Sequence, residues 1–276
     1  MSADSSPLQL DDIRSTLATR CIGQHIHLFE TVSSTNSEAM ALAQAGAVHG
    51  TVVVAESQTA GRGRHARTWF SPSGKNLYCS IIIRGIGSTL PLSDWLSWIP
   101  LTTALAVAET VQAVAAVSLS LKWPNDLLLD EHKIGGILCE SALTPSNDPI
   151  VVIGIGINVN VPRDSFPDDL RPIATSLLSA AGRPIDRNRL LAHLCLEVEQ
   201  GLDELRTQGA TRLRQAYGSR CATLGRHVRV LLNEREDLLG RAESIASDGA
   251  LQVRPTGTPS RAGLIDVRAA DVVHLR

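Results

Sequence analysis

The C-terminal part of the chain has a different pattern of hydrophobic and turn-forming residues from the part before it. After Gly225 the sequence breaks into short runs rich in Val, Ile and Leu, separated by segments such as Asp248-Gly249 and Thr256-Gly257 that favour turns. Such runs are typical of short strands, and close spacing of several strands predicts a small β-barrel. The expected strands are 226–232, 238–245, 251–254, 262–266 and 272–275.

The length of the chain agrees with a division into two parts. At roughly 150 residues per domain, a chain of 276 residues holds about two domains. We place the boundary so that residues 1–222 form the larger domain and residues 223–276 form the small barrel.

The composition excludes several classes of protein. Hydrophobic residues make up 43% and charged residues 20% of the chain, which is ordinary for a globular protein and excludes a disordered, collagen-like or coiled-coil chain. The formal net charge of −2 does not indicate a general polyanion binder, although a local basic patch stays open. Aromatic residues make up only 3%, too few for a surface that stacks single-stranded nucleic acid.

Several patterns bear on the compartment. The five cysteines are scattered and include no CxxC pair, which indicates reduced thiols in a cytoplasmic protein rather than disulfides or a zinc site. The N-terminus lacks a basic start followed by an apolar run, so we expect no signal peptide. The most apolar stretch, 95–121, contains Glu109 and Gln112 and is expected to be a buried core helix rather than a membrane span.

Hydrophobic periodicity predicts both helices and strands in residues 1–222. A short helix is expected around Leu8, Ile13 and Leu17, and the Asn188 to Gly218 stretch also has helical spacing. Further helices are expected at 37–47 and 94–117, and strands at 51–55, 77–84, 118–123, 133–143 and 150–161. A Pro-Asn-Asp turn is expected between the strands 118–123 and 133–143.

A loop rich in glycine and arginine, 58–67, follows the first predicted strand. Its Gly61-Arg62-Gly63-Arg64 segment suits anions, because glycines let backbone amides approach closely and arginines donate charge-assisted hydrogen bonds to phosphate or carboxylate. Trp69, after Arg67, suits packing on a nucleobase. The loop lacks the Gly-Lys-Ser/Thr ending of a Walker loop. An exposed flexible basic loop or a nucleic-acid patch remains an alternative.

A second segment, Lys122-Trp123-Pro124-Asn125-Asp126, places a carboxylate at a turn between strands. Lys133, seven residues after Asp126, starts the returning strand and can face the same site, where a lysine complements a carboxylate or phosphate. The alternative is that Asn125 and Asp126 only make the turn and that Lys133 is a solvated strand end.

Two further segments have a functional and a structural interpretation. Gly154 and Gly156 interrupt a buried apolar strand, which indicates close approach of a ligand or of another element. The continuation into Ile157 and Asn158 excludes a dinucleotide fingerprint, because no helix begins there. Ser34-Thr35-Asn36 offers donors and acceptors that suit a small neutral polar ring, with a plain helix cap as the alternative.

Taken together, in this order and spacing, these segments resemble the biotin protein ligase family (biotin–[acetyl-CoA-carboxylase] ligase). The resemblance spans about residues 20–276. The segments that carry it are Ser34-Thr35-Asn36, Gln58-Thr59-Ala60-Gly61-Arg62-Gly63-Arg64, Lys122-Trp123-Pro124-Asn125-Asp126, Lys133-Ile134-Gly135-Gly136-Ile137-Leu138 and Gly154-Ile155-Gly156-Ile157-Asn158.

The resemblance implies an α+β fold, with a mixed-sheet biotin/lipoate ligase-like catalytic domain followed by a small SH3-like β-barrel. It also implies an ATP-dependent ligase that uses ATP, Mg²⁺ and biotin to form biotinyl-5′-AMP and pyrophosphate. The biotinyl group would then pass to a lysine of a biotin carboxyl carrier protein. A lipoate or octanoyl ligase or transferase of the same fold, and a non-catalytic biotin-binding regulator, remain alternatives.

The same resemblance assigns roles to individual residues. Arg64, Lys133 and Asp126 are the catalytic candidates, with Lys133 polarising the biotin carboxylate or the α-phosphate and Asp126 lying on the nucleotide or Mg²⁺ side or accepting a proton from the incoming lysine. Arg276 is expected to reach the nucleotide from the barrel. No residues are expected to hold a resident metal. The expected biotin contacts are Ser34, Thr35, Asn36, Gln58, Arg62, Gly63, Arg64 and Lys133, and the expected nucleotide contacts are Arg67, Trp69, Asn125, Asp126 and Asn158.

The sequence departs from the family pattern at two points. Ala66 stands where the family loop has glycine, and if this position has a positive φ, alanine costs roughly 1 kcal/mol and slows loop closure. The span before Glu30 is too short for a winged helix with its linker, so we expect no DNA binding. Members of the family often form homodimers by side-by-side sheet extension, and the sequence does not decide whether this chain does so.

Overall fold

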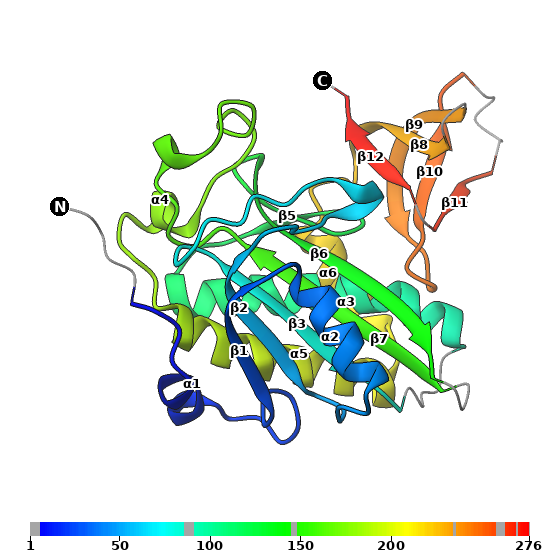
Figure 1. Ribbon diagram of the computed structural model, residues 1–276. Helices are drawn as coiled ribbons and strands as arrows, with labels where there is room; N and C mark the ends of the chain where they lie inside the picture. The colour runs from blue at the N-terminus through cyan, green and yellow to red at the C-terminus, as the bar shows by residue number, and fades with distance from the viewer. Residues whose placement is uncertain are drawn as a thin grey trace.

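A computed structural model of the chain describes residues 6–85, 91–144, 148–233, 236–257, 263–268 and 270–275. Its larger part is built on a mixed seven-stranded sheet in the order β1-β2-β3-β7-β6-β5-β4 (Figure 1). Strands β1 and β2 pair in parallel, and the other neighbours pair antiparallel. The strands are β1 (Ile26–Val32), β2 (Val52–Gln58), β3 (Leu77–Ile83), β4 (Ser120–Lys122), β5 (Asp126–Leu129), β6 (His132–Leu143) and β7 (Pro149–Ile157).

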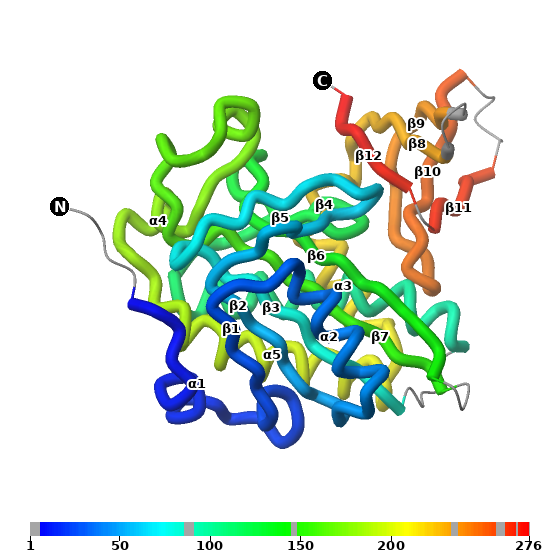
Figure 2. The backbone as a smooth tube through the Cα atoms, in the orientation of Figure 1, coloured from blue at the N-terminus to red at the C-terminus, as the bar shows by residue number. Residues whose placement is uncertain are grey.

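Helices cover both faces of this sheet, as Figures 1 and 2 show. On one face, Ala39 and Ala43 of α2 pack with Val53, Ile82 and Val152 of the sheet in a small apolar cluster. The opposite face packs against α3 and α5 in the main core. The helices are α1 (Leu10–Thr16), α2 (Thr35–Gln44), α3 (Leu92–Ala115), α4 (Leu177–Ala181), α5 (Arg187–Gln208) and α6 (Thr211–Arg220), with short 3₁₀ turns at Arg64–Ala66 and Arg163–Ser165.

The long apolar helix α3 is the core helix predicted at 94–117. Within the described ranges it alone is long and apolar enough to cross a membrane, and 78% of its most apolar window is buried. Its neighbour α5 runs along it with Leu190, Leu194 and Val198 buried at helical spacing. The two helices therefore form a layer that shields one face of the sheet.

The C-terminal part forms a separate five-stranded antiparallel sheet in the order β11-β10-β9-β8-β12. The predicted small β-domain is confirmed, and its strands lie close to the expected positions; Ala262, the expected start of one strand, lies outside the described residues. The strands are β8 (His227–Asn233), β9 (Glu236–Ile245), β10 (Leu251–Pro255), β11 (Ile265–Val267) and β12 (Asp271–His274).

Two buried tryptophans attach one turn of this small sheet to the core. Trp98 of α3 donates through its indole Nε1 to the carbonyl oxygen of Ser247 at 2.8 Å. Trp123, after β4, donates through Nε1 to the carbonyl oxygen of Gly249 at 3.1 Å. Because both indoles are almost fully buried, these hydrogen bonds are shielded from competition with water.

A buried ion pair fastens the N-terminal segment to the sheet. Arg187 Nη1 lies 2.6 Å from Glu56 Oε2, and the arginine side chain is fully buried. The same arginine donates to the carbonyl oxygen of Ser6 at 2.9 Å, and the Leu8 amide donates to Glu56 Oε1 at 2.6 Å. The segment before α1 is therefore held by the strand that ends at Gln58.

Several sequence-based expectations need correction. The turn after Trp123 leads into an additional strand, β5, and not directly into the strand that starts near Lys133, because 126–129 pairs with both β4 and β6. The 188–218 stretch divides into α5 and α6 at Gly209, whose φ is +74°. Strand β1 and the short helix α4 were not expected from the periodicity.

Candidate active site

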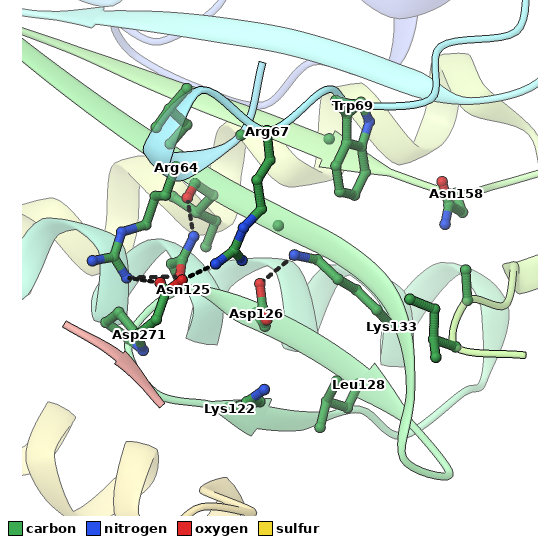
Figure 3. Close-up of a pocket in the computed structure, with 18 of the residues that line it drawn as sticks. Arg64, Arg67, Trp69, Lys122, Asn125, Asp126, Leu128, Lys133, Asn158 and Asp271 are labelled. Carbon is green, nitrogen blue, oxygen red and sulfur yellow. Dashed lines mark hydrogen bonds and ion pairs between the residues drawn. The ribbon is translucent and has the colours of Figure 1, made fainter. Parts of the chain in front are cut away.

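A cleft of about 920 Å³ lies between the large sheet and the small C-terminal sheet. Every described residue that the sequence analysis singled out for the site lines this cleft; Arg276 lies outside the described residues. Figure 3 shows the arginine-rich loop on one side and the Lys122–Asp126 turn on the other. The predicted lining residues are Ser34, Thr35, Asn36, Gln58, Arg62, Gly63, Arg64, Arg67, Trp69, Asn125, Asp126, Lys133 and Asn158.

One end of the cleft carries neutral polar side chains. Gln58, the last residue of β2, accepts a hydrogen bond through Oε1 from the Thr35 amide at 2.9 Å. Asn36 is held by Ser80 of β3, whose hydroxyl lies 2.7 Å from Asn36 Oδ1. Ser34 occupies the N-cap position of α2, but its hydroxyl makes no capping hydrogen bond. A plain helix cap therefore does not account for its side chain.

The two glycines of β7 make room for side chains of the site. A Cβ atom at Gly154 would lie 2.1 Å from Asn36 Oδ1, and one at Gly156 would lie 2.8 Å from the Trp69 indole. The expected close approach is confirmed, and the approaching groups are the Asn36 amide and the Trp69 ring. Both side chains rest on the strand only because glycine leaves that space open.

Backbone hydrogen bonds close the arginine loop into a hairpin. The Trp69 amide donates to the Gly61 carbonyl at 2.9 Å, and the Gly63 amide donates to the Arg67 carbonyl at 2.7 Å. At its tip, His65 and Ala66 have φ values of +53° and +55°. The positive φ suspected at Ala66 is therefore present, and an L-residue with a β-carbon pays a steric cost there.

Two of the three arginines of this loop converge on one carboxylate of the small sheet. Arg67 donates to Asp271, the first residue of β12, and Arg64 Nη1 lies 3.6 Å from the same carboxylate. Arg64 also donates to the carbonyl oxygen of Ala270 at 3.1 Å, and Asn125 Oδ1 lies 3.4 Å from its Nη1. Burial lowers the pKa of Arg64, with the nearby Asp126 acting in the opposite direction. Figure 3 shows both arginines pointing toward Asp271.

An acid–lysine pair lies at the centre of the cleft. Lys133 Nζ lies 2.5 Å from Asp126 Oδ1 and 5.5 Å from the centre of the Trp69 ring, which is within the range of a cation–π contact. Lys133 therefore has two specific partners in the cleft, which a strand end surrounded by solvent alone would not have. Burial also lowers the pKa of Lys122, an effect that Asp126 opposes and Lys133 reinforces.

Asn125 does more than form a turn. Its Nδ2 donates to the carbonyl oxygen of Ile137 at 2.8 Å, and the Ile137 amide donates back to the carbonyl oxygen of Asn125 at 3.0 Å. These two hydrogen bonds fix the turn against β6. The adjacent Asp126 is thereby held within reach of Lys133.

Asn158 lies at the far side of the cleft from the arginines (Figure 3). Its Nδ2 donates to the carbonyl oxygen of Thr175 at 3.1 Å, and its Oδ1 accepts from Asn76 at 3.3 Å. The indole Nε1 of Trp69 is buried and has no hydrogen-bond partner within the described part of the chain. It lies against Gly156 of β7, where an added Cβ atom would come within 2.8 Å of it.

Several residues that shape the site carry no recognisable signal in the sequence. Lys122 is an exception, because it belongs to the Lys122–Asp126 motif and lies opposite Asp126 across the β4–β5 pair. Ser80 and Glu140 both contact Asn36, and Asp271 contacts the arginine loop. These three lie far along the chain from their partners and belong to no segment with a local signature.

The comparisons with known proteins agree with this architecture. Residues 28–160 match the biotin/lipoate A/B protein ligase family, and residues 223–275 match the biotin protein ligase C-terminal domain. A biotin–[acetyl-CoA-carboxylase] ligase of Mycobacterium tuberculosis is 35% identical over 98% of this chain and 97% of its own length. The chain belongs to the biotin protein ligase family.

Other members of the biotin protein ligase family show the same likeness. The bifunctional ligase/repressor BirA of Bacillus spizizenii is 36% identical over 96% of this chain and 78% of its own length. The structure of the biotin protein ligase from Aquifex aeolicus in complex with biotin and ATP superposes with a TM-score of 0.76 at 26% identity. That match covers 92% of this chain and 99% of the other. The family and the α+β fold expected from the sequence are confirmed.

Proposed function

We propose that this cleft carries both half-reactions of a biotin protein ligase. In the first, a biotin carboxylate oxygen attacks the α-phosphorus of ATP, and pyrophosphate leaves with the electrons of the broken P–O bond. In the second, a lysine amine of a carrier protein attacks the acyl carbon of biotinyl-5′-AMP, and AMP leaves. The observation that carries this proposal is the combination, in one cleft, of a neutral polar end with a cluster of cations around Asp126.

The polar end suits the ureido ring of biotin. The ring is neutral and presents both donors and acceptors, which Ser34, Thr35, Asn36 and Gln58 can match. The amide of Asn36 and the oxygen of Gln58 are already fixed by protein hydrogen bonds. A preordered pocket of this kind loses little side-chain entropy when a ligand binds.

The cationic side suits the reacting carboxylate and phosphate. Lys133 is placed to stabilise negative charge on the carboxylate and the α-phosphate, and Arg62, Gly63 and Arg64 close over the same region. Arg67, Asn125 and Asn158 are proposed nucleotide contacts, with the Trp69 ring against the adenine. The chemistry asks for positioning and charge stabilisation more than for covalent help from the protein.

Mg²⁺ is proposed to arrive with ATP rather than as a resident metal. Over the ranges that the structure covers, no group of three or more His, Cys, Asp or Glu side chains is arranged to hold a metal ion. Mg²⁺ bound with nucleotides commonly needs only one or two carboxylates, the remaining ligands being phosphate oxygens and water. Of the carboxylates that line this cleft, Asp126, Glu131 and Asp271, we propose Asp126 for this role because it lies beside Lys133.

For the transfer step, Asp126 is the proposed acceptor of the proton that the attacking lysine loses. The proposed acceptor is the biotin carboxyl carrier protein of acetyl-CoA carboxylase. The proposed location of the enzyme is the cytoplasm. We also propose that residues 1–222 form the catalytic domain and residues 223–276 the C-terminal domain. The proposed oligomeric state is a homodimer.

The decisive experiment measures both half-reactions. Biotin and ATP together should release pyrophosphate, and lipoate in place of biotin should not. Labelled biotin should appear on a carrier domain only when ATP is present. Lys133→Ala should depress pyrophosphate release far more than it lowers the melting temperature. Pyrophosphate release that depends on lipoate, or none at all with either acid, would overturn the proposed function.

A further inference from the structure

Glu140 of β6 joins two parts of the site that are distant in sequence. Its Oε2 accepts a hydrogen bond from Asn36 Nδ2 at 2.8 Å and another from Arg62 Nη2 at 3.0 Å. Asn36 belongs to the polar end of the cleft and Arg62 to the arginine loop. Glu140 itself does not line the cleft, so its influence must pass through these two partners.

The contacts of Asn36 fix the orientation of its amide. Nδ2 also donates to the Leu138 carbonyl oxygen at 3.1 Å, and the Ser80 hydroxyl lies 2.7 Å from Oδ1. A flip of the amide would turn Oδ1 toward the carboxylate of Glu140 and the Leu138 carbonyl, where oxygen would face oxygen. The acceptor oxygens of Glu140 and Leu138 therefore together select which end of the Asn36 amide faces Ser80.

The contacts of Arg62 tie the loop to the same place. Its Nη2 donates to Glu140 and lies 3.2 Å from the hydroxyl of Ser37, the residue next to Asn36. The Arg62 guanidinium thus bridges β6 and the start of α2 while the loop lies over the cleft. Opening the loop would break this bridge and leave the carboxylate of Glu140 without its cation.

We infer that Glu140 is a positioning residue that couples closure of the arginine loop to the orientation of Asn36 in the polar pocket. This inference rests on the proposed function, because it concerns how long the closed loop retains biotinyl-5′-AMP. Glu140 touches no reacting atom. It holds one pocket residue and one loop residue through a single oxygen atom.

The test uses two variants with different expected effects. Glu140→Gln keeps an oxygen for Asn36 but removes the charge that holds Arg62, so the release of biotinyl-5′-AMP should become about fivefold faster with little change in KM for biotin. Glu140→Ala also frees Asn36, so KM for biotin should rise as well. Glu243→Gln is the matched control, because Glu243 pairs with Arg254 on the small sheet with a similar side-chain exposure.

A second background separates coupling from a general loss of structure. If Glu140 acts through Arg62, Glu140→Gln should add nothing to the release rate in an Arg62→Met protein. Release by Glu140→Gln at the wild-type rate, or equal acceleration in both backgrounds, would overturn the inference and leave the proposed function intact. A wild-type protein that forms no biotinyl-5′-AMP would overturn the proposed function, and this inference with it.

Discussion

Arg67 of the arginine loop donates to the carboxylate of Asp271, which lies 204 residues later in the chain on the small C-terminal sheet. Arg64 and His65 approach the same carboxylate, with His65 Nε2 at 3.3 Å. The tip of the loop is therefore anchored by a residue outside the large sheet. The site is complete only when the two sheets are in place together.

Asp271→Asn should weaken the nucleotide side of the site. Without its charge the loop loses its anchor, and KM for ATP should rise by about three- to tenfold, since the three contacts are partly exposed and individually modest. Steady-state kinetics at several ATP concentrations measure this change. Asp237→Asn, which removes a pair with Arg229 elsewhere on the small sheet, is the control. A lower KM for ATP would show instead that Asp271 competes with phosphate for the arginines.

Ala66→Gly should favour the closed loop. The φ of Ala66 is +55°, and glycine at such a position avoids a steric cost of roughly 1 kcal/mol. Biotinyl-5′-AMP should therefore dissociate about fivefold more slowly, as followed by chase with unlabelled biotin and ATP. Ala60→Gly controls for added flexibility, because Ala60 is exposed nearby without a positive φ. Faster dissociation from Ala66→Gly would mean that flexibility outweighs the relief of strain.

Gly156→Ala should displace Trp69 from the cleft. The added Cβ would lie 2.8 Å from the indole, so the ring would have to move away from β7. Adenylation should fall at least about tenfold while the fold survives, because the collision falls on a side chain at the cleft and not on the core. Tryptophan fluorescence and pyrophosphate release report the two effects. Gly218→Ala, with only one contact at 3.9 Å, should leave adenylation unchanged.

The free energy of unfolding should fall as the pH drops from about 6.5 toward about 4. Burial lowers the pKa of His274 to about 4 from 6.5, and Lys122 and Arg226 add to this effect. In that window the unfolded chain binds a proton at this histidine and the folded chain does not, so acid favours unfolding. Urea titrations of His274→Gln should show a weaker slope with pH than wild type. His25→Gln, at an exposed position, should keep the wild-type slope.

Arg187→Met should destabilise the fold strongly. The arginine side chain is fully buried, and its removal leaves the carboxylate of Glu56 without a cation. We expect the free energy of unfolding to fall by about 3–5 kcal/mol. Urea unfolding measures the change, and limited proteolysis should cut near Ser6 and Leu8, which this pair holds. Adding Glu56→Gln should recover part of the loss. If the loss of free energy of unfolding in the double variant equals the sum of the losses in the two single variants, the two residues act independently.

Much of the fold was predictable because it depends on local signals. The strands of the small sheet follow one another with turn residues between them, and each pairs mainly with a neighbour in sequence. The buried helix α3 is continuous and apolar. In contrast, β1 lies at the edge of the sheet with a half-exposed pattern, so its periodicity is weak. The strand β5 spans only 126–129 and overlaps the motif that was interpreted as a turn.

The sequence predicts which segments form the candidate site, but it does not predict the side-chain contacts that connect them. The motif residues line one cleft because the strands that carry them are adjacent in the sheet. Glu140 and Asp271 contact the site from positions without any local pattern, since a single carboxylate on a strand is typical of a solvated face. Their partners could be found only after β6 and β12 were placed beside the loop.

The indoles of Trp98 and Trp123 hold one turn of the small sheet from two directions. Trp123 is directly followed by Pro124, Asn125 and Asp126. A shift of the small sheet would therefore act on the backbone that leads into Asp126, three residues after Trp123.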